Sequence, residues 1–275
     1  MHDVFFDAIC VMNCGISFTS FHRAVGVRYI SRDEGLDGID FDFEGIRSVR
    51  EWTAYLAFLS EASDRLHRAG LLATVALHPG QHLPSNVCAI LDRVHVMTYD
   101  MMIRQPSSST ATTDRHHHHA SMHVVEDAME GFVRTGCPPS KLVMGIPAYG
   151  RHERDPGLVR TYSELVDEII IVNNGGGDDG MSETEMEATT AKTTTAVVLR
   201  SINSRSGYRF DSPDDVRAKV EYALRSGLGG VFIWELGQDK RMPGQAEGGV
   251  LLEAAAAAAA SAVDRPAGDV PGDEL

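Results

Sequence analysis

Residues 37–44 read Asp37-Gly38-Ile39-Asp40-Phe41-Asp42-Phe43-Glu44, an apolar run in which, from Asp40 onward, an acidic residue stands at every second position. Side chains of an extended strand alternate between its two faces. A strand here therefore places Gly38 and the acids from Asp40 to Glu44 on one face and the apolar residues from Ile39 to Phe43 on the other. One face carries a column of carboxylates, and the other is built to be buried.

The apolar face predicts where this strand lies. A strand at the protein surface has no need of Ile39, Phe41 and Phe43 on its reverse side. A strand that is buried on one face and acidic on the other suits a parallel barrel, in which helices cover the outward face. Because Glu44 comes last, we expect it at the carboxyl end of the strand, where barrel active sites lie.

The pattern Asp-Gly-x-Asp-x-Asp-x-Glu resembles the signature of glycoside hydrolase family 18, the chitinases and their relatives. The resemblance implies that Glu44 protonates the glycosidic oxygen, that Asp42 orients the 2-acetamido group of the substrate, and that Asp40 tunes Asp42. The acetamido oxygen then attacks the anomeric carbon, a substrate-assisted route outside the usual two-carboxylate scheme. Clustered carboxylates suit this chemistry, since one stays protonated as an acid while its neighbour stays charged.

Three further segments resemble the same family, in its order along the chain. Residues 96–101 (Val-Met-Thr-Tyr-Asp-Met) resemble a Met-x-Tyr-Asp strand end, whose Tyr and Asp hydrogen-bond the acetamido group. Residues 142–151 resemble the next strand, whose Tyr and Arg line the sugar cleft. Residues 229–239 resemble the last strand, whose Trp forms the floor under the reacting sugar, because an indole offers a flat apolar surface. The substrate-binding residues implied are Met97, Tyr99, Asp100, Tyr149, Arg151 and Trp234. Each segment alone has a purely structural interpretation, and it is their combination and order that favour a binding role.

Strand-like and helix-like segments alternate between the motifs. We expect strands at 36–44, 71–77, 93–98, 141–147 and 230–234, and helices at 47–70, 87–91, 123–135 and 212–227. Gly70 is a helix stop, and Ser212-Pro213 is a helix start. The alternation predicts an α/β fold, and with the resemblance it predicts a (β/α)8 barrel of the TIM type.

Five clear strands are fewer than a complete barrel needs. The three βα units that precede the motif strand in this family would need on the order of 90 residues, but only 35 residues lie before it. We assign 22–32 as a helix and 4–12 as a remnant strand, and expect an N-terminally truncated barrel. We place the catalytic barrel at residues 1–250 and an Ala-rich, low-complexity tail at 251–275, with a helix at 254–260.

Two inserts interrupt the family pattern, at residues 104–120 and 173–196. The first ends in His116-His117-His118-His119, which we interpret as part of a solvated loop rather than a metal site. Consecutive histidines cannot all face one ion, and no acidic or Cys partner stands at ligand spacing. The second insert has too little apolar sequence to build the small α+β domain found there in larger relatives, so we expect an open, shallow groove.

Composition limits the class of partner. A net charge of −14 offers nothing to a phosphate backbone, so nucleic acid is not an expected partner. No apolar run approaches the roughly 20 residues of a membrane span. The four cysteines have no paired spacing, and residues 1–20 do not resemble a signal peptide, although the family resemblance implies secretion.

The sequence therefore predicts an endo-acting hydrolase of β-1,4-linked N-acetylglucosamine polymers, acting on chitin or chitooligosaccharides without a cofactor. Two alternatives stay open. A barrel of this kind also serves as a lectin-like oligosaccharide-binding protein with little or no turnover. An endo-β-N-acetylglucosaminidase acting on N-glycans shares the acidic motif, although residues 96–101 and 234–239 resemble chitinases more closely.

Overall fold

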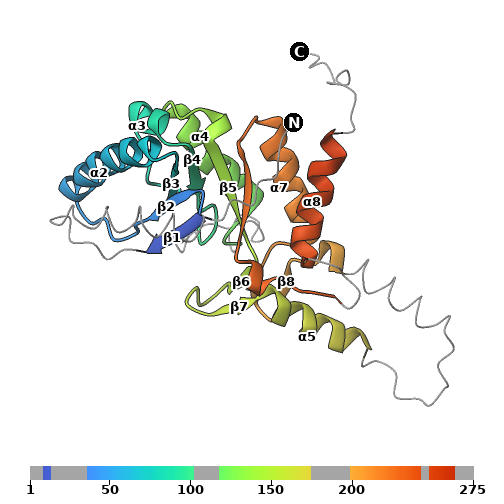
Figure 1. The fold of residues 1–275 in the computed structure, drawn as a ribbon. Helices are drawn as coiled ribbons and strands as arrows, with labels where there is room; N and C mark the ends of the chain where they lie inside the picture. Colours follow the sequence, from blue (N-terminus) through green and yellow to red (C-terminus); the bar gives the residue numbers. More distant parts are fainter. Residues whose placement is uncertain (1–8, 14–35, 102–117, 175–198, 243–247, 264–275) are drawn as a thin grey trace, which may run out of the picture. The chain divides into compact units, whose positions relative to one another are not determined.

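A computed structural model of the chain describes residues 9–13, 36–101, 118–174, 199–242 and 248–263 (Figure 1). Contacts between residues divide it into two compact units. The first comprises the chain up to residue 146 together with 226–232. The second comprises residues 147–225 and the chain from 233 onward.

A sheet of six strands organises the first unit. Its order is β1-β2-β3-β4-β5-β10, and the pairs from β1 to β5 are parallel. Because parallel strands end at the same edge, the residues that follow each strand gather there. The strands are β1 (Ile9–Asn13), β2 (Gly38–Asp42), β3 (Leu72–Leu77), β4 (Arg93–Val96), β5 (Leu142–Pro147) and β10 (Gly230–Trp234).

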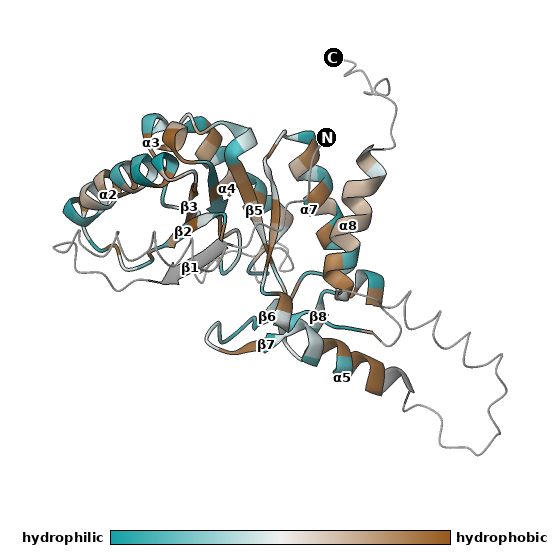
Figure 2. Cartoon of the chain, viewed as in Figure 1, coloured by the Kyte–Doolittle hydropathy of each residue, from teal (hydrophilic) through white to brown (hydrophobic). Residues whose placement is uncertain are grey.

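Helix α2 (Val49–Arg68) covers the apolar face of β2. The Ser48 side chain accepts the Glu51 N–H at 3.2 Å, and Glu51 accepts the Arg47 N–H at 2.6 Å, which closes the first turn as a capping box. The rings of Phe41 and Phe58 meet edge to face at 5.2 Å, and the Tyr55 hydroxyl donates to the Phe41 carbonyl at 3.1 Å. The strand face that the sequence predicted to be buried therefore packs on a helix. Figure 2 shows α2 with hydrophilic and hydrophobic residues interspersed, and β5 as hydrophobic.

Two cross-links fix α3 (Ser85–Ile90) to the segment that follows α4 (Met122–Arg134). A disulfide joins Cys88 to Cys137, 49 residues apart. In the short 3-10 helix η1 (Pro139–Lys141), the Lys141 ammonium donates to the carbonyls of Ala89 at 2.5 Å and Leu91 at 2.6 Å. These carbonyls belong to the end of α3, which a cation stabilises.

The second unit contains a four-stranded sheet in the order β7-β6-β9-β8, antiparallel throughout. Glu168 of α5 accepts from Arg160 of β7 at 2.6 Å and from Arg205 of β8 at 3.0 Å, which ties the helix to both edges of this sheet. Helices α7 and α8 lie side by side (Figure 1). The elements are β6 (Tyr149–His152), β7 (Val159–Thr161), α5 (Tyr162–Asn174), β8 (Ser204–Arg205), β9 (Tyr208–Arg209), α7 (Pro213–Arg225), the 3-10 helix η2 (Leu236–Gln238) and α8 (Val250–Val263).

Asp239 fixes the start of α8. Its carboxylate accepts the N–H groups of Leu251 and Leu252 at 3.1 Å and 3.0 Å, which places a negative group on the N-terminal end of the helix. Gly249 leaves room for it, since a Cβ there would lie 2.2 Å from Asp239 Oδ2. Burial raises the pKa of Asp239, and the three backbone N–H groups that it accepts oppose this rise.

The predicted α/β fold is confirmed, and all five predicted strands are present. Of the expected remnant strand at 4–12, residues 9–12 form most of β1, and the rest lies outside the described residues, as does the predicted helix at 22–32. The insert at 173–196, which we expect to hold too little apolar sequence for an α+β domain, lies almost wholly outside the described residues, but the segments that flank it supply a small sheet and α5. The local pattern hid these strands, which are two to four residues long. The domain limits at 250 and 275 stay predictions, although α8 buries Ala254, Ala255 and Ala258.

Candidate functional site

Asp40 is the innermost of the three acids on β2. It is buried, and its Oδ1 accepts from the Thr74 hydroxyl on β3 at 2.5 Å and lies 2.8 Å from His95 Nδ1 on β4. Gly38 permits this close pairing of β2 and β3, because a Cβ there would lie 2.4 Å from the Leu72 carbonyl oxygen. Two neighbouring strands thus hold one oxygen of Asp40 in place.

Asp42 ends β2 and is partly exposed. Its Oδ1 atom is buried and has no hydrogen-bond partner among the described residues. Burial raises the pKa of the Asp42 carboxyl, the charges of Glu44 and Asp40 raise it further, and His78 opposes them. A buried carboxylate oxygen without a partner among the described residues has unused capacity to accept an N–H group.

Glu44 lies two residues beyond the end of β2, and its carboxylate faces His78, the residue after β3. The distance between Glu44 Oε2 and His78 Nε2 is 2.8 Å, and the two side chains are 50% and 45% exposed. The Gln81 side chain accepts the His78 N–H at 2.7 Å, so a turn orients the histidine. Glu44 is accessible to a ligand, as an acid that protonates a substrate has to be.

Tyr99 lies close to these acids. Its ring is buried near Phe232 at a centroid distance of 6.3 Å, and the charge of Asp42 acts on it. Burial and the charge of Asp42 raise the pKa of the Tyr99 hydroxyl, so it stays protonated as a donor. A Cβ on Gly145 would lie 2.7 Å from the Tyr99 ring, so glycine at this position makes room for it. Met97 is buried in the same segment, and its N–H donates to the Leu77 carbonyl at 2.9 Å.

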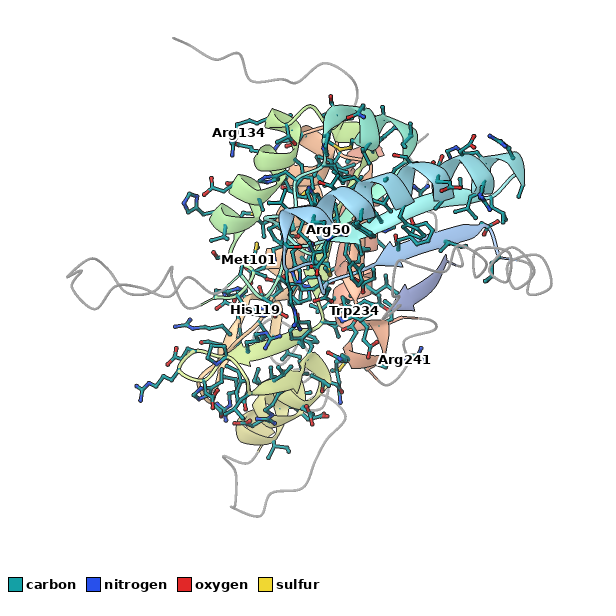
Figure 3. The ribbon with its side chains drawn as sticks, turned by 90° about the vertical axis from the view of Figure 1, so that its left-hand side faces the viewer. Arg50, Met101, His119, Arg134, Trp234 and Arg241 are labelled. Carbon is teal, nitrogen blue, oxygen red and sulfur yellow. A yellow bond between two sulfur atoms is a disulfide. The ribbon has the colours of Figure 1, made fainter. Side chains whose placement is uncertain are left out.

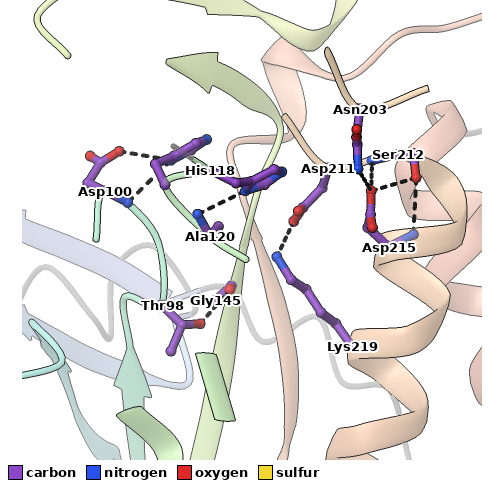
Figure 4. A network of polar contacts seen from close by, with 11 residues as sticks. Thr98, Asp100, His118, Ala120, Gly145, Asn203, Asp211, Ser212, Asp215 and Lys219 are labelled. Carbon is purple, nitrogen blue, oxygen red and sulfur yellow. Dashed lines mark hydrogen bonds and ion pairs between the residues drawn. The ribbon is translucent and has the colours of Figure 1, made fainter. Parts of the chain in front are cut away.

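Asp100 follows Tyr99 with a left-handed backbone, at a φ of 60°. His119 Nδ1 lies 3.2 Å from Asp100 Oδ1 and 3.3 Å from the Asp100 backbone nitrogen (Figure 4). The structure therefore brings five of the nine predicted site residues to one edge of the parallel sheet, with Met97 buried beneath them. The five are Asp40, Asp42, Glu44, Tyr99 and Asp100.

The other three predicted residues belong to the second unit. Tyr149 on β6 is buried, and the Arg151 guanidinium lies 5.8 Å from the centre of its ring. Arg151 also donates to the Pro156 carbonyl at 2.5 Å. Trp234 ends β10, its carbonyl accepts the Ala148 N–H at 2.7 Å, and its side chain, labelled in Figure 3, is 41% exposed. An exposed indole is available for stacking on a sugar.

The prediction of a solvated loop is wrong for residues 119 and 120, because His119 and Ala120 are completely buried. Residues 104–117 of this insert and most of the insert at 173–196 lie outside the described residues. Within the described ranges, no three His, Cys, Asp or Glu side chains gather as metal ligands. No described helix has both the length and the apolar composition to span a membrane.

Sequence reasoning missed Thr74, His78, His95 and His119. His78 carried a usable signal, since it directly follows a predicted strand of a parallel sheet, as Glu44 does. Thr74 and His95 lie inside strands and carried the weaker signal of polar residues among apolar neighbours.

Comparison with known proteins identifies a family. The family described as "Glycosyl hydrolases family 18" matches residues 17–239. Endochitinase 1 of Metarhizium robertsii is 25% identical over 239 residues, which cover 78% of this chain and 54% of that protein. Nod factor hydrolase protein 1 of Medicago truncatula is 29% identical, over 76% of this chain and 60% of that protein. The chain thus spans between half and two thirds of the length of these relatives.

Solved structures share the fold. A family GH18 chitinase from Cycas revoluta, crystallised with allosamidin, matches with a TM-score of 0.61 and 22% identity, over 91% of this chain and 80% of that one. A chitinase from Bacteroides thetaiotaomicron matches with a TM-score of 0.67 and 15% identity, over 95% and 78%. The match over residues 17–239, which contain every predicted site residue, establishes that the chain belongs to the glycosyl hydrolases of family 18.

Proposed function

We propose that this chain hydrolyses β-1,4-linked N-acetylglucosamine polymers, with Glu44 as the acid and base. The observation that carries the proposal is the graded series of carboxylates on β2. Asp40 is buried and held by two partners, Asp42 is half-buried with one oxygen that has no partner among the described residues, and Glu44 is half exposed. The family resemblance implies that Asp40 tunes Asp42, that Asp42 orients the acetamido group and that Glu44 transfers the proton. Exposure increases in the same order, so the residue proposed to reach the glycosidic oxygen is the most accessible of the three.

In the proposed reaction, Glu44 gives its proton to the glycosidic oxygen as the bond to the anomeric carbon breaks. The acetamido oxygen of the substrate forms the new bond to that carbon, while Asp42 Oδ1 accepts the acetamido N–H. Glu44 then takes a proton from water, and the resulting hydroxide opens the cyclic intermediate with net retention. Two observations support this assignment: Asp42 Oδ1 has no hydrogen-bond partner among the described residues, and the Tyr99 hydroxyl stays protonated, so each suits one atom of the acetamido group.

The remaining sugar contacts are proposed from the family resemblance. Trp234 would stack on the sugar, and Tyr149 and Arg151 would contact its edges. The exposure of the Trp234 indole supports the first role. A crystal structure of the family in complex with (GlcNAc)3, from Cycas revoluta, records that ligand class for a protein of the same fold.

Glu44→Gln tests the proposal, because an amide keeps the shape of the side chain but cannot donate the proton. We expect turnover of chitooligosaccharides to fall on the order of 10²- to 10⁴-fold, with oligosaccharide binding unchanged within a few-fold. Glu61→Gln is the matched control, since Glu61 is 49% exposed on α2 and forms a surface ion pair with Arg65 on the same helix. Retention of more than a tenth of the turnover in Glu44→Gln contradicts the role of Glu44.

Substrate choice separates the alternatives. N-acetylated oligomers should be cut with retained anomeric configuration, deacetylated oligomers and cellooligosaccharides should not, and a thiazoline analogue of the intermediate should inhibit. EDTA should have no effect. Binding of chitooligosaccharides without turnover by the wild-type chain would favour the lectin-like alternative, and cleavage of N-glycan cores in preference to chitooligosaccharides would favour the endo-β-N-acetylglucosaminidase.

We also propose that the chain matures in an oxidising compartment, as secretion requires. The Cys88–Cys137 disulfide supports this, because such bonds are rare in reducing cytosol. Thiol titration of protein isolated from its natural source tests it, and two free thiols at Cys88 and Cys137 would count against it.

A further inference from the structure

The histidine run of the sequence ends in a buried residue that contacts the candidate site. His119 is completely buried, and its carbonyl accepts the Met101 N–H at 2.8 Å. Figure 3 labels both residues, and they lie close together in it. The neighbouring ring of His118 stacks on that of His119 at 5.6 Å, and His118 Nδ1 accepts the Ala120 N–H at 3.1 Å. The segment 118–120 is therefore folded back onto the end of β4.

Asp100 is the residue that this segment contacts. Its φ of 60° lies in the left-handed region, which is uncommon for a residue with a Cβ, although Asp adopts it more readily than most. Asp100 Oδ1 and the Asp100 backbone nitrogen lie 3.2 Å and 3.3 Å from the same His119 nitrogen. With a proton on Nδ1 the ring donates to the carboxylate, and without it the ring accepts the amide N–H. Either tautomer fixes Asp100.

We infer that His119 is a positioning residue for Asp100, which it holds in the left-handed conformation that presents the Asp100 carboxylate to an N-acetylated sugar. The inference rests on the proposed function for the identity of the ligand. It gives a function to the last residue of the run His116–His119, which its composition predicts to be part of a solvated loop. A side chain that only filled the core would not need a ring nitrogen directed at both polar groups of Asp100.

A double-mutant cycle tests the inference. Asp100→Ala removes the residue that contacts the sugar, and His119→Leu removes the ring that holds it while keeping an apolar side chain. Each single change should lower kcat/KM for chitooligosaccharides about 10- to 100-fold, because a misplacement of about 1 Å has effects of this size. If His119 acts through Asp100, His119→Leu added to Asp100→Ala should change kcat/KM by less than about 2-fold.

Two further variants separate positioning from folding. His119→Asn keeps a polar atom near the place of Nδ1 and should restore most of the activity lost in His119→Leu. His123→Asn is the matched control, since His123 lies on α4, is 77% exposed, and forms an i,i+4 surface pair with Asp127. Thermal unfolding of each variant, compared with wild type, shows whether a variant that has lost activity is still folded. Additive effects in the cycle, or no rescue by His119→Asn in a folded protein, would overturn the inference.

The experiment also distinguishes this inference from the proposed function. If the wild-type chain neither cuts nor binds chitooligosaccharides, the proposed function has failed. Crystal structures of wild type and His119→Leu then decide the positioning role by the φ of Asp100. Departure of Asp100 from the left-handed region in His119→Leu would support that role, and an unchanged Asp100 would refute it.

Discussion

Gly145→Ala should disturb the candidate site without touching a catalytic group. Gly145 lies on β5 with no backbone requirement for glycine, so in the folded state the added methyl group acts through steric contact alone. A Cβ there would lie 2.7 Å from the Tyr99 ring, 2.8 Å from the Phe232 ring and 2.9 Å from the Val96 carbonyl oxygen. Each of these atoms has to retreat by roughly 0.5–0.7 Å to reach an ordinary contact distance of 3.4 Å.

The magnitude follows from two opposing effects. Overpacking of a buried site costs about 1–3 kcal/mol, and the loss of chain freedom in the unfolded state offsets about 0.4–1 kcal/mol of it. The free energy of unfolding should therefore fall by about 1–2 kcal/mol. Because Tyr99 moves, kcat/KM for chitooligosaccharides should fall by about 10- to 100-fold, a larger effect than the loss of stability alone would produce at 25 °C.

Urea unfolding and steady-state kinetics on the same preparation measure both effects. Gly237→Ala is the matched control, because a Cβ at Gly237 meets nothing within 4 Å and the residue has no positive φ. An unchanged urea midpoint together with full activity in Gly145→Ala would refute the reasoning. A loss of stability with full activity would refute only the role of Tyr99.

Three predictions concern stability. Replacing Cys88 and Cys137 together by Ala should lower the free energy of unfolding by about 2–4 kcal/mol, and dithiothreitol should then have no further effect on the urea midpoint. Hydrogen bonds from Ser206, Arg160 and Arg205 lower the pKa of Glu168 to about 2 from its ordinary 4.5. The stabilisation by the Glu168 carboxylate is therefore complete above pH 4.5 and is lost as the pH falls towards 2. The free energy of unfolding, measured with urea at pH 7, 4 and 3, should therefore fall more steeply in wild type than in Glu168→Gln. Asp239→Ala should cost about 0.5–2 kcal/mol, because it removes the acceptor of the N–H groups at the start of α8; a difference below 0.3 kcal/mol, roughly the error of such a measurement, would show that the cap contributes little.

The parallel sheet could be predicted because its strands from β2 onward are short, mostly apolar or alternating runs that are separated by helix-like segments. Residues 37–44 alone determined which face of β2 meets α2, and the contacts of Phe41 with Phe58 and Tyr55 agree with that prediction. The acidic column and Tyr99 followed from the same alternation and from a motif at a strand end.

The contacts that the sequence could not reveal join residues far apart in the chain. Nothing in the spacing of Cys88 and Cys137 distinguishes a bonded pair from two free thiols, since 49 residues separate them. The partners of Asp40 are 34 and 55 residues away. His119 is one of four consecutive histidines, and no local pattern shows which of them is buried. Strands of two residues, such as β8 and β9, carry no measurable period.

The two-residue alternation of β2 also restricts how this segment can change. A shift of the strand by one position would exchange the faces completely, so that Asp40 and Asp42 would meet the aromatic rings of α2 while Phe41 and Phe43 would replace them at the candidate site. Single-residue insertions and deletions within 38–44 are therefore excluded, whereas substitutions on either face act locally. Only a shift by two residues keeps the acids and the aromatic rings on their own faces. The segment is therefore a poor place for loop grafting and a dependable reference point for aligning distant relatives.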